Sequence, residues 1–100
     1  MPEYRFSRLA RLDLIEIADY TVDMWGLEQA SRYLDGLDGC FRQLARTPGI
    51  GRPCDRIRRG YRSMEHEKHV VIYRVDGEGI FISRILHRRM LPSRHLIEDA

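Results

Sequence analysis

The side chains that could take part in catalysis gather in the second half of the 100-residue sequence. His69 and His87 could serve as a general base and a general acid, and nearby arginines could hold a phosphate, as a metal-independent ribonuclease requires. These arginines are Arg62, Arg84, Arg88 and Arg89. Histidines at strand ends also commonly make hydrogen bonds or interface contacts, and arginines there are usually solvated. From these residues alone, a nuclease and a binding surface both remain open.

Metal and cofactor chemistry is disfavoured by the spacing of the other candidates. His66 and His69 are one residue closer than in the His-Glu-x-x-His motif, and residues three apart in a strand point to opposite faces. The sequence also lacks a phosphate-binding loop and a dinucleotide-binding glycine pattern. Two cysteines, Cys40 and Cys54, are too few for a disulfide framework. We therefore expect no metal, no cofactor and two free thiols, with Cys40 in the core.

The composition predicts one small domain spanning residues 1–100, with 43% apolar residues. Residues 1–50 contain 6 basic and 8 acidic side chains, whereas residues 51–100 contain 11 and 7, so the second half carries the positive charge. All but one of the 17 basic residues are arginine, whose planar fork pairs with carboxylates and phosphates. A net charge of +2 is too small for a dedicated nucleic-acid binder. We expect no sequence-specific binding of nucleic acid.

Neither a membrane span nor a secretion signal is evident in the sequence. No apolar run approaches the ~20 residues that cross a bilayer. The first residues also lack a basic segment followed by an apolar stretch. We therefore expect a cytoplasmic protein without membrane contact.

Two amphipathic helices are predicted in the first half. Apolar residues recur at intervals of three and four from Leu9 to Trp25, with Ser7 as the N-cap and Gly26 as the stop. A second such pattern runs from residue 30 to 45 and ends at Thr47-Pro48, because a residue before proline disfavours helix. The two helices form a hairpin.

Four residues of the hairpin carry further expectations. Trp25 and Tyr33 are expected to be structural, locking the helices to each other and to the rest of the fold. Gly36 and Gly39 lie inside the second helix, where each costs about 1 kcal/mol relative to alanine. They either allow close contact or mark a weak helix, and the sequence does not distinguish the two.

The second half predicts a sheet. Residues 48–60 are rich in turn formers and predict a loop. Three segments rich in β-branched and aromatic residues follow, and Tyr4–Phe6 could add a fourth strand. The three segments are Tyr61–Met64, His69–Val75 and Ile80–Leu86. The expected fold class is α+β, with an N-terminal helical hairpin packed on a mainly antiparallel sheet of three to four strands.

Both faces of the two long strands carry apolar side chains, although a helical hairpin can cover only one face. The other face is either exposed for a partner or covered by the 48–60 loop and the tail after Met90. Arginines flank that face, and we favour a partner.

The sequence from Tyr4 to Leu96 resembles the ParE branch of the ParE/RelE toxin superfamily of bacterial type II toxin–antitoxin modules. The order and spacing of several short motifs carry this resemblance. They include Tyr4-Arg-Phe-Ser, Trp25-Gly26, Gly60-Tyr61-Arg62, Tyr73-Arg74, Arg84-Ile-Leu-His87 and Arg89-Met90.

The resemblance implies a toxin without enzymatic activity that traps DNA gyrase on cleaved DNA and is neutralised by a ParD-like antitoxin. We expect the last strand and its continuation to contact gyrase, through Arg84, His87, Arg88, Arg89 and Met90. We expect the antitoxin to lie over Arg58, Tyr61, Arg62, Tyr73 and Arg74.

The RelE branch suggests an alternative function, cleavage of mRNA in the ribosome. Its site is rich in lysine and arginine, with a tyrosine or histidine near the chain end. Here Lys68 is the sole lysine and no tyrosine follows Tyr73, which argues against the nuclease. His87 and the arginines near it keep this alternative open.

Overall fold

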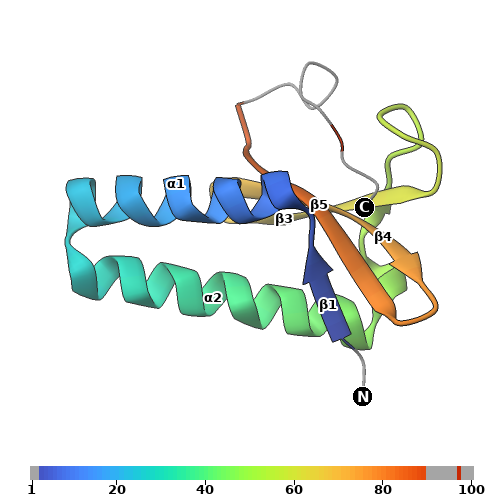
Figure 1. The fold of residues 1–100 in the computed structure, drawn as a ribbon, viewed down its shortest axis with the longest axis horizontal. Coiled ribbons are helices and arrows are strands. Elements are labelled where there is room, and N and C mark those ends of the chain that lie inside the picture. Colours follow the sequence, from blue (N-terminus) through green and yellow to red (C-terminus); the bar gives the residue numbers. More distant parts are fainter. Residues whose placement is uncertain (1–2, 90–96, 98–100) are drawn as a thin grey trace.

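Two long helices and a five-stranded sheet make up the part of the chain that the structure, a computed structural model, describes: residues 3–89 and 97. The elements are β1 (Glu3–Phe6), α1 (Arg8–Trp25), α2 (Leu27–Arg46), the short 3₁₀ helix η1 (Pro48–Ile50), β2 (Arg52–Pro53), β3 (Tyr61–His66), β4 (His69–Asp76) and β5 (Gly79–His87). The helices form an antiparallel hairpin whose far end projects beyond the sheet (Figure 1). The expected α+β class is confirmed.

Local signals set the helix ends where the sequence places them. The Ser7 side chain accepts a hydrogen bond from the Ala10 amide at 2.9 Å and so caps α1. Gly26, with φ of 88°, joins the two helices, because glycine adopts this conformation without strain. Thr47 ends α2 just before Pro48. None of the described helices is both long and apolar enough to cross a lipid bilayer.

The sheet has the order β1-β5-β4-β3-β2. β1 pairs with β5 in parallel and the other neighbours are antiparallel. The expectation of three to four strands is corrected by β2, which pairs with β3 inside the segment expected to be loop. A two-residue strand that ends in proline gives almost no strand signal, and proline is tolerated here because β2 lies at the sheet edge.

One irregularity interrupts the pairing of β4 with β5. Ile72 lies opposite Arg84 and Tyr73 lies opposite Ile82, so Ser83 is an extra residue in β5. Ser83 is fully buried, and its carbonyl accepts a hydrogen bond from the Ser7 hydroxyl at 2.6 Å. The start of α1 is thereby attached to this bulge.

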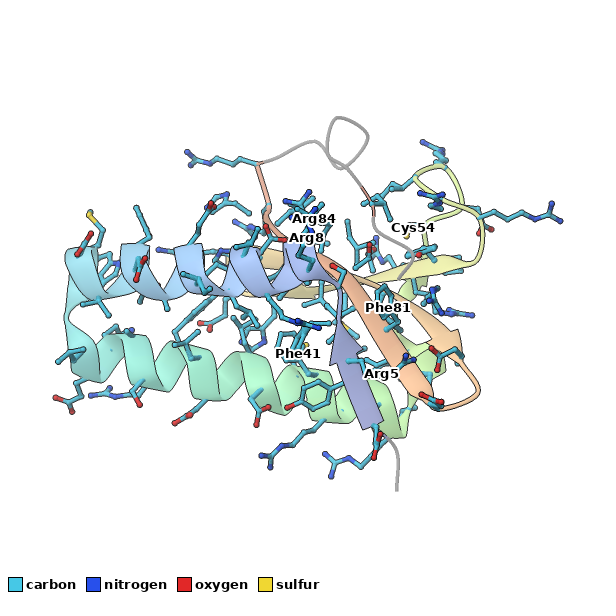
Figure 2. The ribbon with its side chains drawn as sticks, viewed as in Figure 1. Arg5, Arg8, Phe41, Cys54, Phe81 and Arg84 are labelled. Atoms are coloured by element: carbon cyan, nitrogen blue, oxygen red, sulfur yellow. The ribbon has the colours of Figure 1, made fainter. Side chains whose placement is uncertain are left out.

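The main core lies between the helices and one face of the sheet. Phe41 projects from α2 into this layer (Figure 2). Leu37, Leu44 and Cys40 join it from the same helix, and Val71 and Ile82 join it from the strands. The expected burial of Cys40 is confirmed, and Cys40 and Cys54 are both free thiols.

The second face of the sheet carries its own apolar cluster, which corrects the favoured expectation that this face is exposed for a partner. Tyr61, Ile72 and Leu86 pack there with Ile97, which is 8% exposed. Cys54, Ile57 and Val70 complete the cluster. The loop and a residue of the tail thus cover this face, which is the alternative that the strand pattern left open.

Close approaches explain two of the glycines. A Cβ atom on Gly51 would lie 2.3 Å from the Tyr73 hydroxyl oxygen, so only glycine fits beside that ring. A Cβ atom on Gly36 would lie 3.2 Å from the His66 ring, which indicates that this glycine permits contact with the β3–β4 turn. Nothing lies within 4 Å of a Cβ atom on Gly39, and the structure does not explain that residue.

A buried ion pair joins α1 to β5. The Asp13 carboxylate accepts hydrogen bonds from Arg84 Nε at 2.8 Å and Arg84 Nη2 at 2.9 Å, and from the Ile85 amide at 3.0 Å. Figure 2 shows Arg84 reaching the first turns of α1. The two side chains are 10% and 12% exposed, so the pair is shielded from water.

We expect the substitution Asp13→Ala to lower the free energy of unfolding by about 3 kcal/mol, because it removes the buried carboxylate that accepts two hydrogen bonds from Arg84 and one from the Ile85 amide. Urea denaturation measures this change. The exposed Glu28–Arg32 pair gives the matched control, since Glu28→Ala should cost no more than about 0.5 kcal/mol. Equal losses in the two variants would contradict the importance of the buried pair.

Candidate functional site

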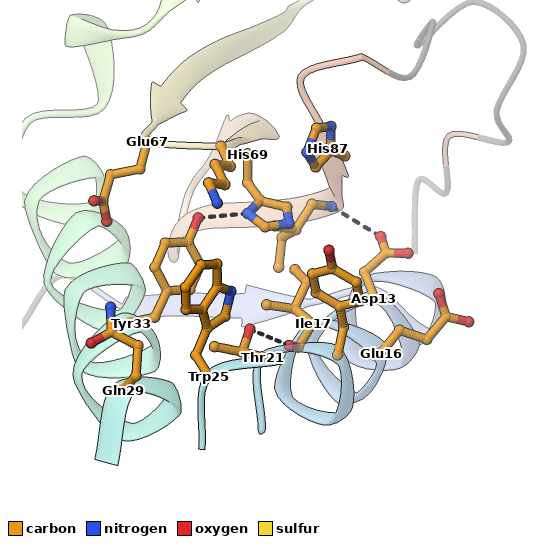
Figure 3. Close-up of a pocket in the computed structure, with 13 residues that line it drawn as sticks. Asp13, Glu16, Ile17, Thr21, Trp25, Gln29, Tyr33, Glu67, His69 and His87 are labelled. Carbon is orange, nitrogen blue, oxygen red and sulfur yellow. Dashed lines mark hydrogen bonds between the residues drawn. The ribbon is translucent and has the colours of Figure 1, made fainter. Parts of the chain in front are cut away.

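A pocket of about 510 Å³ opens between the helical hairpin and the strand ends near His69 and His87 (Figure 3). Trp25 and Tyr33 stand on the helix side of the pocket, and the two histidines stand on the sheet side. Ile17 belongs to the apolar part of its lining. The pocket therefore brings together residues from both halves of the sequence.

Tyr33, His69 and His87 form a connected cluster in this pocket. The Tyr33 hydroxyl lies 2.5 Å from His69 Nδ1, and the rings of His69 and His87 meet edge to face with their centroids 5.6 Å apart. Tyr33 is half-buried and packs against the main core, which agrees with its expected structural role. The tyrosine thus joins α2 to β4.

The surroundings set the protonation states of the cluster. Burial, followed by the nearby charge of His87 and then of His66, lowers the pKa of His69 to about 4. Burial likewise raises the pKa of the Tyr33 hydroxyl. At neutral pH the imidazole of His69 is therefore uncharged, and its Nδ1 shares a hydrogen bond with the Tyr33 hydroxyl. One ring nitrogen of His69 is therefore already engaged within the protein.

Trp25 contradicts its expected place in the core, since the residue is 60% exposed. It lies at the end of the hairpin that projects beyond the sheet (Figure 1) and lines the pocket mouth. The Lys68 ammonium lies over its ring, 5.5 Å from the centroid. Helical spacing alone cannot show where the sheet ends, and that is why the sequence assigned Trp25 to the core.

The residues expected to contact gyrase differ in their surroundings. Arg84 is committed to Asp13 inside the protein. His87 lines the pocket, and its Nδ1 accepts a hydrogen bond from the Arg89 amide at 3.1 Å. Arg88 and Arg89 are exposed, and the Arg88 amide bonds to the Lys68 carbonyl at 2.8 Å. Met90 lies outside the described residues.

The two tyrosines expected to contact an antitoxin lie inside the protein. Tyr73 is fully buried, where its hydroxyl donates to the Pro48 carbonyl at 2.6 Å and accepts from the Gly51 amide at 3.0 Å. Tyr61 is 3% exposed and belongs to the apolar cluster on the second face. Tyr73 belongs to the main core and Tyr61 to the cluster on the second face, so the two side chains lie on opposite faces of the sheet.

The three arginines that are expected to contact an antitoxin lie nearer to solvent than the two tyrosines. Arg62 donates to the Gly51 carbonyl at 2.7 Å and Arg58 donates to the Ile97 carbonyl at 3.0 Å. Arg74 lies over the Phe81 ring, 4.5 Å from its centroid. Each guanidinium also serves the fold, because it satisfies a carbonyl or covers a ring.

Sequence reasoning missed Asp13 and Glu16 as residues of this region. The sequence does contain a sign of Asp13's role, because its carboxylate stands on the apolar face of α1. It comes three residues after Ala10 and four before Ile17. A carboxylate at such a position needs a buried partner. Within the described residues, no group of three or more side chains is arranged to hold a metal ion.

A family model described as "ParE toxin of type II toxin-antitoxin system, parDE" matches residues 4–92. The chain belongs to this toxin family. The Toxin ParE1 of Mycobacterium tuberculosis is 46% identical over 94 residues, which cover 93% of this chain and 96% of that protein. The Toxin ParE1 of Caulobacter vibrioides is 42% identical over 96 residues, with 96% and 99% covered. The resemblance to the ParE branch is confirmed.

Solved structures of related toxins share the fold. The structure titled "Chromosomal ParDE TA system from P. aeruginosa" superimposes with a TM-score of 0.75 at 28% identity, covering 87% of this chain and 96% of that one. The RelBE2 toxin-antitoxin complex of Mycobacterium tuberculosis gives a TM-score of 0.62 at 26% identity, with 88% and 100% covered. The ParE-like arrangement of hairpin and sheet is therefore shared with members of both branches.

The depressed pKa of His69 predicts how stability depends on pH. The unfolded chain binds a proton at this residue as the pH falls through 6.5, whereas the folded protein does not until about 4. The burial of neutral His69 therefore contributes fully to the free energy of unfolding above pH 6.5, and this contribution is lost as the pH falls to about 4.

We expect the free energy of unfolding to fall more steeply between pH about 7 and about 4 in the parent protein than in a His69→Gln variant. Urea denaturation at intermediate pH values measures both slopes. Equal slopes would show that the imidazole is not held neutral by its surroundings.

Proposed function

We propose that this ParE-family chain inhibits DNA gyrase, blocks replication and is neutralised by a ParD-like antitoxin. The observation that carries this proposal is the match to the ParE family over residues 4–92, with relatives covered almost end to end. The likeness to a ParDE structure supports it. A gyrase target places its action in the cytoplasm, and no enzymatic activity of its own is required.

The end of β5 is the surface that we assign to the gyrase contact. Arg88 and Arg89 are consecutive, and both are exposed there. His87 lies beside them, and Met90 continues the same segment outside the described residues. Arg84 takes a different role in this proposal, because its ion pair with Asp13 holds β5 against α1 and so positions the segment.

We expect the double substitution Arg88→Glu and Arg89→Glu to abolish growth inhibition, because it reverses two exposed charges of the proposed contact. The thermal midpoint should move by less than about 2 °C, since exposed substitutions rarely alter stability. Induced expression, followed by scoring of DNA breaks and of supercoiling by purified gyrase, measures the effect.

The matched control for this experiment reverses Arg56 and Arg59, two exposed arginines of the loop before β3, and should leave toxicity intact. Undiminished toxicity after substitution of Arg88 and Arg89 would contradict the assigned surface. Translation arrest without DNA breaks in the parent protein would contradict gyrase as the target.

The contact of His69 with His87 favours a second candidate, the ribosome-dependent cleavage of mRNA, since two histidines can share acid and base roles. Two features weigh against it. The Tyr33 hydroxyl occupies His69 Nδ1, and Glu16 and Glu67 in the same pocket repel a phosphate. Transcript cleavage on purified ribosomes that disappears in a His87→Ala variant would establish the nuclease instead.

The antitoxin contact is assigned to the guanidinium groups of Arg58, Arg62 and Arg74. Guanidinium groups form strong, often bidentate hydrogen bonds with carboxylates, which suits an acidic antitoxin segment that orders on binding. Tyr61 and Tyr73, which the sequence also assigned to this contact, are buried on opposite faces of the sheet and are left out of the proposed contact. The likeness to chains from a ParDE system and a RelBE2 toxin–antitoxin complex supports such a partner.

We expect Arg58→Gln to weaken binding of the antitoxin encoded beside this chain by roughly tenfold, the effect of losing one charge-assisted hydrogen bond. Calorimetric titration of the purified chain measures it. The same change at Arg46, an exposed residue at the end of α2, should leave the affinity unchanged. Equal affinities of the Arg58 and Arg46 variants would place the antitoxin elsewhere.

A further inference from the structure

The mouth of the pocket exposes two large aromatic side chains that the proposed gyrase and antitoxin contacts do not use. Tyr20 is 63% exposed and Trp25 is 60% exposed, and both line the pocket from α1. Side chains of this size contribute strongly to binding because they bring a large contact area at a low cost in conformational entropy. Their position at a cavity indicates a binding site.

The charges of the pocket favour a cation over an anion. Glu16 and Glu67 contribute carboxylates to the lining, and Glu16 has no ion-pair partner among the described residues. Asp13 also lines the pocket but is compensated by Arg84. Lys68 is the sole lysine of the chain, and the lowered pKa of His69 leaves that imidazole uncharged at neutral pH. A phosphate or carboxylate ligand would therefore meet more negative than positive charge.

The pocket already holds a cation over an aromatic ring. The Lys68 ammonium lies 5.5 Å from the centroid of the Trp25 ring, a geometry in which the ring face attracts positive charge. Lys68 is an exposed residue on the β3–β4 turn, with a long flexible stem. A second cation of better geometry could displace it at little cost.

We propose that this pocket binds the side chain of an arginine or lysine carried by a protein segment. The cation lies over the Trp25 ring, in the place that Lys68 partly fills, and the Tyr20 ring and the Glu16 carboxylate line the same pocket. Ile17 and Ile85 provide an apolar floor for an aliphatic residue next to it. The volume of about 510 Å³ lies within the range of ordinary ligand sites, about 300 to 1,000 Å³.

Trp25 makes this proposal directly measurable, because it is the sole tryptophan of the chain and its fluorescence reports on the pocket. The purified protein is titrated with a short leucine-containing peptide that has a central arginine, and with the same peptide containing citrulline, which has nearly the same shape but no charge. We expect a saturable fluorescence change whose affinity for the arginine peptide exceeds that for the citrulline peptide by at least about fivefold. Equal affinities for the two peptides would overturn the proposal.

Removing a negative or a positive charge from the pocket should change the affinity for the arginine peptide in opposite directions. Glu16→Gln should weaken binding of the arginine peptide by at least about threefold, and Lys68→Ala should strengthen it by about threefold, because Lys68 competes for the same ring. Asp19→Asn and Arg52→Gln remove one exposed charge of each sign outside the pocket and should change neither affinity. Weaker binding in Lys68→Ala, or a fluorescence response to AMP with none to the arginine peptide, would show that the pocket prefers an anion.

Discussion

The Asp13 carboxylate is the interaction on which the two layers depend. It accepts both donors of the Arg84 fork and the Ile85 amide, so one buried side chain on α1 satisfies three groups of β5. The bulge at Ser83 lies at this point of the strand. Ser7 adds a second attachment there, through its hydroxyl and through its amide, which donates to the Ile82 carbonyl at 2.9 Å. The irregular part of β5 is therefore the part most firmly joined to a helix.

This attachment also determines which residues the protein can present to a partner. It withdraws Arg84 from the surface, although the sequence places Arg84 in the same basic segment as Arg88 and Arg89. β5 is anchored to α1 just before its end, and Arg88 and Arg89 follow directly as exposed residues of a turn. The same geometry brings His87 against His69, and Tyr33 closes that cluster from the helix side.

The length of the hairpin relative to the sheet produces the second feature of the surface. α1 and α2 extend beyond the strands, so the last turn of α1 has no sheet to pack against (Figure 1). Trp25 and Tyr20 consequently remain in solvent at the pocket mouth, with Lys68 reaching across from the β3–β4 turn. An apolar helical stripe that is longer than the layer it packs on thus becomes a candidate binding surface.

The sequence by itself determined the elements whose ends depend on local chemistry. Ser7, Gly26 and Pro48 bound the helices through a side-chain cap, a positive φ and a fixed proline ring, and runs of β-branched and aromatic residues mark β4 and β5. It also carried the family resemblance, because that rests on the order of short motifs.

Only the tertiary structure decided what distant residues do together. Three features depend on which segments meet in space. They are the pairing of Arg84 with Asp13, the packing of Ile97 on Ile72, and the place of Trp25 at a pocket mouth. Strand periodicity shows that a face is apolar, but it does not show what packs on it. Burial is a property of two surfaces in contact, and a sequence pattern describes one surface at a time.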